Sequence, residues 1–393
     1  MEAYAEMATI INSTKDPKMI YLPLNENRNE IRLIAFEEPP EGSCLIHCAL
    51  ETVSLDDIRD NYKAYLASPN AKGKSQRKAI SLWANRQNPA RYETDLGSDH
   101  VPPVDAYRYL WGDYVALSYV WGSEAKGRDI VLNGRKTTIT KNLEIALQAI
   151  SRTKYHVGRY RLWVDALCIN QEDEDERASQ VKKMRGVYSG AWSVIAWLGQ
   201  EYDKSDKAFD LLQQLASLAA ESRTLGFGQL HLDTELFDGS SFYGLSELIN
   251  RPYWSRLWIV QELVLGASAS ILRCGNRLMS WPTFCTGIEV LFRSDLWVIK
   301  DSLLMDELQR RGLEGREWNA MRLHLLHQDL RILSQYEEEA TGRLGFRRLL
   351  DIACLSDCRD TRDKVFALVG MMEPQKHYHT SIPSATRACS SLM

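Results

Sequence analysis

The stretch RLWVDALCINQEDEDERASQVKKMRGVYSGAWSVIAWLG, residues 161–199, decides the fold. It opens with an apolar strand, RLWVDAL, and closes with another, WSVIAWLG. Between the two strands, apolar residues recur at spacings of three and four, which is the pattern of an amphipathic helix. These residues are Val181, Met184, Val187, Tyr188 and Ala191. A strand–helix–strand unit of this kind predicts parallel strands joined by a right-handed crossover.

The residues before this unit continue the alternation of strands and helices. An apolar strand, YVALSYVWG, covers residues 114–122. The segment DIVLNGRKTTIT that follows is typical of a β-hairpin turning on Asn133 and Gly134. Residues 142–152, NLEIALQAISR, then repeat apolar side chains at helical spacing.

The residues after this unit add helices and a second hairpin. A helical stretch covers residues 204–220, and SILRCGNRLMSW indicates a hairpin turning on Gly275 and Asn276. We therefore predict an α/β fold with a parallel-sheet core of the flavodoxin type, added β-hairpins and a helical C-terminal region.

Four regions follow from the distribution of these elements. The N-terminal region holds two predicted strands, IRLIAF and SCLIHCALETV, and a polar, basic segment that reads as a linker. We predict a strand pair and basic linker that pack on the core (1–110), the α/β core (111–275), a helical remainder (276–371) and an unstructured tail (372–393).

The composition argues against several classes of partner. The 393 residues are 45% apolar and 25% charged, with a formal net charge of −4, so no basic surface for nucleic acid is indicated. The N-terminus lacks a basic start followed by an apolar run, and no apolar stretch approaches the roughly 18 residues of a membrane span. We expect a cytoplasmic protein with no membrane partner.

The cysteines predict neither disulfides nor a metal site. The eight cysteines are scattered, and no two are spaced as CxxC. Cys44 and Cys48 bracket His47, but on a strand positions four apart lie roughly 13 Å from each other, too far to share one zinc ion. We therefore interpret both as buried thiols.

The acidic run QEDEDE, residues 171–176, invites two interpretations. Asp173 or Asp175 precedes a helical pattern, where a carboxylate accepts bonds from free N–H groups and meets the positive end of the helix dipole. A divalent-metal loop is the alternative, but the spacing of a calcium-binding loop is absent. Capping and solvation are the preferred interpretation.

Candidate site residues gather where ligands bind in open parallel sheets, beyond the carboxyl ends of the strands. Ser118 and Trp121 end the first core strand, and Asp165 ends the second. Asp165 is flanked by apolar residues, so an unpaired carboxylate there would be costly. It either accepts hydrogen bonds as a structural anchor or lines a cleft, and the sequence leaves both open.

A third group lies in WSRLWIVQEL, residues 254–263. If one helix starts at Pro252, then Ser255, Trp258 and Glu262 share a face of it. Apolar residues nearly all round predict a buried helix, in which the charge of Glu262 needs a cation such as Arg251 or Arg256. Glu262 is either one half of a structural ion pair or a carboxylate that lines a cleft.

These segments resemble the successive blocks of the fungal heterokaryon-incompatibility (HET) domain. The blocks are YVALSYVWG, the 161–199 stretch, RPYWSRLWIVQEL and DTRDKVFALVGM, and IRLIAF is similar to the usual opening of the domain. The resemblance spans roughly residues 31–371. It implies a role in fungal non-self recognition, in which fusion of incompatible cells triggers programmed death.

The same blocks show a fainter resemblance to Toll/interleukin receptor (TIR) domains. The shared features are a first strand ending in a Ser–aromatic pair, a second ending in Asp, and a helix with Trp258, Glu262 and Leu263 in the TIR pattern, although Ile259 replaces the usual Cys. In enzymatic TIR domains that glutamate acts in NAD cleavage. The resemblance implies that Glu262 and Asp165 are catalytic.

Two hypotheses follow from these resemblances. In the first, self-association of the core switches on an NAD glycohydrolase whose cleft comprises Ser118, Trp121, Asp165 and Glu262, with Trp121 or Trp258 stacking on a ring. NAD is then a substrate, and no cofactor or metal is expected. In the second, the chain is a non-enzymatic interaction module that recruits a death-signalling partner. Either version responds to an upstream protein trigger that the sequence does not identify.

Overall fold

The computed structural model describes residues 21–56, 114–122, 127–152, 161–191, 193–222, 238–256, 258–265, 270–294 and 296–313. The strands are β1 Glu30–Glu37, β2 His47–Ser54, β3 Val115–Tyr119, β4 Arg128–Leu132, β5 Arg135–Ile139, β6 Arg161–Trp163, β7 Ser193–Trp197, β8 Ile271–Cys274 and β9 Arg277–Ser280. The α-helices are α5 Lys141–Ser151, α6 Asp165–Cys168, α7 Glu174–Gly190, α8 Ser205–Ser222, α9 Gly239–Ile249, α10 Trp258–Leu265, α11 Trp281–Arg293 and α12 Leu296–Arg310. Two 3-10 helices are η1 Glu26–Arg28 and η6 Pro252–Ser255.

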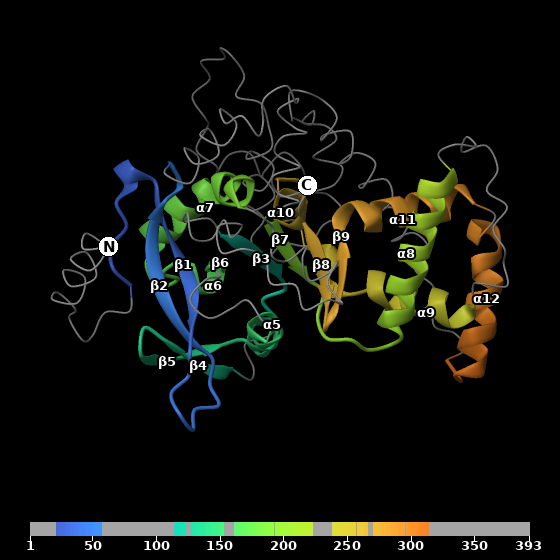
Figure 1. Ribbon diagram of the computed structural model, residues 1–393, viewed down its shortest axis with the longest axis horizontal. Helices are drawn as coiled ribbons and strands as arrows, with labels where there is room; N and C mark the ends of the chain where they lie inside the picture. The colour runs from blue at the N-terminus through green and yellow to red at the C-terminus, as the bar shows by residue number, and fades with distance from the viewer. Residues whose placement is uncertain are drawn as a thin grey trace, which may run out of the picture.

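The strands form one sheet in the order β5-β4-β2-β1-β6-β3-β7-β8-β9 (Figure 1). Four neighbouring strands, β6, β3, β7 and β8, run parallel. Counted along the chain, these four lie in the order 2-1-3-4, so the crossover direction reverses at β3. Right-handed crossovers in opposite directions place their helices on opposite faces, and α5 and α7 lie on opposite sides of the sheet in Figure 1. The predicted α/β fold is confirmed, although β3 separates β6 from β7 instead of the two pairing directly.

The N-terminal strands continue this same sheet. β1 pairs antiparallel with β6, with Ile34 opposite Leu162, and β2 runs parallel to β4, with His47 opposite Val131. The sheet is therefore mixed, and the expected parallel core is limited to four strands. The predicted linker and tail lie outside the described residues, so the region boundaries stay predictions.

Both predicted hairpins are confirmed. In the first, Asn133 and Gly134 have φ values of 50° and 76°, as a type I′ turn requires. In the second, Cys274 of β8 lies opposite Arg277 of β9, and Gly275 at the turn has a φ of 56°. Asn and Gly occupy these positions because they tolerate positive φ better than other residues do.

The acidic run starts helix α7, as predicted. Asp173 is the N-cap residue, and its Oδ1 accepts a hydrogen bond from the Glu176 amide at 2.9 Å. Among the described residues, no group of three or more His, Cys, Asp or Glu side chains could hold a metal ion. Solvation does not describe Glu176, however, because its carboxylate is paired with the buried Arg32.

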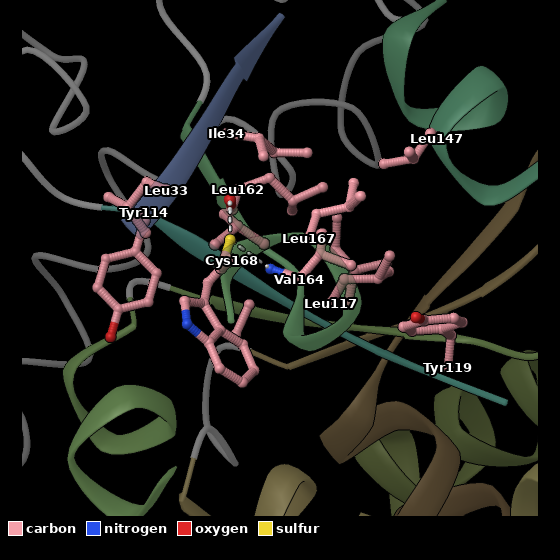
Figure 2. Packing of buried hydrophobic residues seen from close by; sticks show 14 of the residues in the cluster. Leu33, Ile34, Tyr114, Leu117, Tyr119, Leu147, Leu162, Val164, Leu167 and Cys168 are labelled. Carbon is pink, nitrogen blue, oxygen red and sulfur yellow. Dashed lines mark hydrogen bonds between the residues drawn. The ribbon is translucent and has the colours of Figure 1, made fainter. Parts of the chain in front are cut away.

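Buried side chains form two hydrophobic clusters. One lies between the sheet and helices α5 and α7, and Figure 2 shows part of it around Cys168. The other joins β8 and β9 to α8, α9, α11 and α12, on the right of Figure 1. Trp258 packs against both clusters. None of the helices in the described ranges has the length and apolar character needed to cross a membrane.

The cysteine expectation holds for Cys48 but is wrong for Cys44. Cys48 is buried in β2, whereas Cys44 is exposed because it precedes the first residue of that strand. Cys168 is also buried, and its Sγ donates to the carbonyl of Leu162 at 3.8 Å and accepts from the Val164 amide at 3.3 Å (Figure 2). Burial raises the pKa of the Cys48 and Cys168 thiols to about 12.

Alkylation of the folded protein should therefore separate these thiols. With iodoacetamide at pH 8, Cys44 should be modified, while Cys168 stays unmodified because a pKa of about 12 leaves almost no thiolate at pH 8 and the sulfur is buried. Peptide mapping by mass spectrometry measures each site separately. In concentrated urea Cys168 should react as fast as Cys44, and equal rates in the folded protein would contradict the expectation.

Candidate functional site

The residues singled out from the sequence meet at one edge of the sheet. β3 and β6 are parallel, so their carboxyl ends lie at the same edge. Ser118 belongs to β3, Trp121 follows that strand, and Asp165 is the first residue of α6. Asp165 therefore begins a helix instead of ending a strand, because β6 already ends at Trp163.

Ser118 and Glu262 are in direct contact across the sheet face that α7 and α10 cover. The Ser118 hydroxyl donates to Oε2 of Glu262, and its Oγ lies 2.7 Å from the hydroxyl of Tyr253. All three side chains are buried. Hydroxyl contacts replace part of the hydration that a buried carboxylate loses.

Arg256 is the cation that balances Glu262. Its Nη1 and Nη2 donate to Oε2 and Oε1 of Glu262 at 3.2 and 3.3 Å, which makes a bidentate ion pair. Burial disfavours the charge of the guanidinium, but Glu262, Tyr253 and Asp165 raise the pKa of Arg256 above its usual value. Arg256 therefore stays protonated at neutral pH.

Arg251, the other cation considered from the sequence, has different partners. Its Nη1 donates to the carbonyl of Leu198 at 2.8 Å and lies 3.0 Å from Sγ of Cys274. Its guanidinium carbon lies 4.2 Å from the centre of the Tyr202 ring, a cation–π contact. Arg251 thus joins the loop after β7 to β8 and takes no part in the Glu262 pair.

Asp165 and Trp121 form the outer part of the site. The Trp121 indole donates to Oδ2 of Asp165 at 2.7 Å, and the Ala166 amide donates to Oδ1 at 2.7 Å. Burial of the carboxyl group raises the pKa of Asp165, and the bond from Trp121 and the charge of Arg256 partly offset this rise. Trp121 is 38% exposed, so its ring remains accessible beside the carboxylate.

Three buried tyrosines surround the charged groups. Burial raises the pKa values of Tyr119, Tyr188 and Tyr253. The negative charge of Glu262 adds to this effect for all three, and that of Asp165 for Tyr119 and Tyr188. Their hydroxyls stay protonated at neutral pH, and protonated hydroxyls can donate hydrogen bonds. Such donors favour a negative charge at the site.

The expected long helix around Glu262 is interrupted. The 3-10 helix η6 ends at Ser255, and Arg256 then adopts an extended conformation, with φ −71° and ψ 129°, before α10 begins. Ser255 therefore does not share a helix face with Trp258 and Glu262, and its hydroxyl donates to the carbonyl of Pro252. Trp258 is partly buried and packs against both core clusters, whereas Trp121 is 38% exposed.

The structure thus joins the predicted residues into two contacting pairs, Ser118 with Glu262 and Trp121 with Asp165, with the charge of Arg256 acting on both carboxylates. Tyr253 was not anticipated, because no local pattern indicates a contact with a residue 135 positions away. The arrangement can place negative charge beside a developing cation, bind an anionic group on Arg256, and contact a planar ring through Trp121.

Comparison with known proteins identifies similarity to one family. Residues 114–262 match the family described as heterokaryon incompatibility protein (HET). Heterokaryon incompatibility protein 6, OR allele, from Neurospora crassa is 29% identical over 200 residues, which is 42% of this chain and 29% of that relative. The chain therefore matches less than a third of the relative's length. No solved structure matches the chain.

Proposed function

We propose that this chain acts in fungal heterokaryon incompatibility, because residues 114–262 match the HET family. The similarity to a Neurospora incompatibility protein supports this role. As its mechanism we propose NAD cleavage that leads to programmed cell death, triggered by self-association of the core. The observation that carries the mechanism is the placement of Glu262 against Ser118 at the carboxyl edge of the parallel strands, beside the accessible ring of Trp121.

The proposed reaction breaks the bond between nicotinamide and ribose. As the nitrogen of nicotinamide leaves with the bonding electrons, positive charge develops on the ribose, and the Glu262 carboxylate stabilises it. A water molecule then adds to the ribose carbon and loses a proton, which gives nicotinamide, ADP-ribose and H⁺. In this proposal Asp165, whose pKa is raised chiefly by burial, accepts that proton.

A second candidate function rests on the ion pair of Glu262. The Glu262 side chain is 1% exposed, and both of its carboxylate oxygens accept bonds from Arg256. A carboxylate held in this way also suits a structural pair. In that case the domain acts as a non-enzymatic module that recruits a death-signalling partner.

Replacing Glu262 with Gln should distinguish the two candidates. Gln is nearly isosteric but cannot stabilise a cation, so NAD cleavage should fall by about 100-fold or more. The measurement is nicotinamide release by concentrated, purified protein, followed by chromatography.

Glu307→Gln is the matched control. Glu307 is another buried glutamate paired with arginines, Arg310 and Arg311, but it lies in α12, away from the site. The control variant should keep wild-type turnover, with circular dichroism checking the fold of both variants. If concentrated wild-type protein releases no nicotinamide, the enzymatic mechanism fails and the recruiting module is favoured.

A further inference from the structure

Arg256 occupies the boundary between the buried carboxylate and solvent. Its side chain is 18% exposed, whereas that of its partner Glu262 is 1% exposed. The same guanidinium acts on Asp165, which accepts the indole N–H of the accessible Trp121. A molecule that approaches Glu262 from the Trp121 side therefore meets the positive charge of Arg256 before it meets the carboxylate.

The bonds between Arg256 and Glu262 are longer than those of another buried ion pair in the described part of the chain, Arg32 with Glu176. The two bonds of Arg256 measure 3.2 and 3.3 Å, whereas Arg32 holds Glu176 at 2.6 and 2.9 Å. Charge-assisted bonds between guanidinium and carboxylate are usually about 2.7–2.9 Å long. The Arg256 guanidinium therefore lies farther from its carboxylate than the Arg32 guanidinium does from Glu176.

The Arg256 pair can be broken without removing every partner of Glu262. Arg256 has an extended backbone conformation and lies between η6 and α10, outside both helices. If its side chain turned away, Glu262 would keep the hydroxyl bond from Ser118. The carboxylate would thus remain in place and gain access from the side on which Arg256 now lies.

We propose that Arg256 is the phosphate-binding residue of a nucleotide site, and that a bound phosphate draws the guanidinium away from Glu262 and uncovers it. A guanidinium presents a planar fork of donors that fits a phosphate as well as a carboxylate. Trp121 supplies a ring on which a base stacks, and Asp165 accepts from a ribose hydroxyl. The inference rests on the proposed function, since it describes how that site takes its substrate.

The proposal makes Glu262 and a phosphate compete for the same cation. Removing the charge of Glu262 should release the Arg256 fork and strengthen phosphate binding, whereas removing the fork should weaken it. If the pair is purely structural, neither substitution should change the affinity for a ligand in a way that depends on its phosphate.

Binding of ADP, a product-like probe that cannot be cleaved at a nicotinamide bond, tests this competition by isothermal titration calorimetry. Relative to wild type, Glu262→Gln should bind ADP about tenfold more tightly and Arg256→Gln about tenfold more weakly, a change equal to one charge-assisted hydrogen bond. Arg177→Gln is the control, because it removes an exposed arginine of α7 that pairs with Glu174, and its affinity should equal that of wild type. Adenosine, which has no phosphate, should bind all of these variants alike.

The double variant Arg256→Gln/Glu262→Gln controls for loss of folding in the single variants. It leaves no unpaired buried charge, and it should bind ADP as weakly as Arg256→Gln, in contrast to Glu262→Gln alone. Equal ADP affinities for Glu262→Gln and the double variant would overturn the proposal, as would the absence of ADP binding to every variant. If the protein cleaves NAD but the variants do not show these differences in ADP affinity, only the proposed role of Arg256 is rejected. If the differences in ADP affinity are found but NAD is not cleaved, only the proposed reaction is rejected.

Discussion

Replacing Arg32 with Met is expected to lower the free energy of unfolding by about 3–5 kcal/mol. Arg32 is 2% exposed, and its guanidinium makes two bonds to Glu176, from Nη1 to Oε1 at 2.6 Å and from Nη2 to Oε2 at 2.9 Å. Nη1 also donates to the carbonyl of Cys168 at 3.1 Å. Without the cation, a largely buried carboxylate and a buried carbonyl both lose their donor.

The expected loss is large because this pair joins distant parts of the chain. Arg32 lies in β1 and Glu176 in the first turn of α7, 144 residues later. Glu176 also accepts from the amide of Asn170 at 2.8 Å, so it orders the loop between α6 and α7 as well. Chemical denaturation followed by circular dichroism measures the change in the free energy of unfolding.

Arg277→Met provides the control for charge removal. Arg277 pairs with Asp210, and both side chains are substantially exposed, so its loss should cost less than about 1 kcal/mol. Replacing Arg32 and Glu176 together with Met should recover part of the loss, because no unpaired charge is then buried. Equal effects of Arg32→Met and Arg277→Met would show that burial of the pair has no energetic consequence.

Replacing Trp163 with Ala is expected to destabilise the fold by about 3–5 kcal/mol through the cavity it creates. Trp163 ends the short strand β6 and is fully buried, and its ring meets that of Tyr188 edge-on with centroids 5.5 Å apart. The aromatic contact therefore ties β6 to helix α7. Thermal or chemical denaturation measures the loss.

Trp163→Phe separates the contribution of the ring from that of the indole nitrogen. The buried Nε1 has no hydrogen-bond partner among the described residues, so Phe removes an unsatisfied donor while it keeps an aromatic ring. This variant should lose less than half as much stability as Trp163→Ala. If the two variants are equally unstable, the indole nitrogen has a stabilising partner and packing is not the main effect.

The candidate site could be predicted from the sequence only in part. Ser118 and Asp165 could be predicted because they lie at the carboxyl ends of apolar segments predicted to be parallel strands, and parallel strands bring these ends together. The choice between Arg251 and Arg256 as the partner of Glu262 could not be made, since both lie close to it in the sequence. The interruption at Arg256 decided this choice, because it turns one arginine toward Glu262 and leaves the other against Leu198 and Cys274.

The sequence by itself determined the elements whose causes are local. The Asp173 cap, the turn at Asn133 and Gly134, and the apolar spacing of α7 all act within a few residues, so they are readable from one segment. Only the tertiary structure decided that β1 pairs with β6 and that Arg32 meets Glu176. Such contacts depend on packing between segments more than 100 residues apart, for which local preferences contain no information.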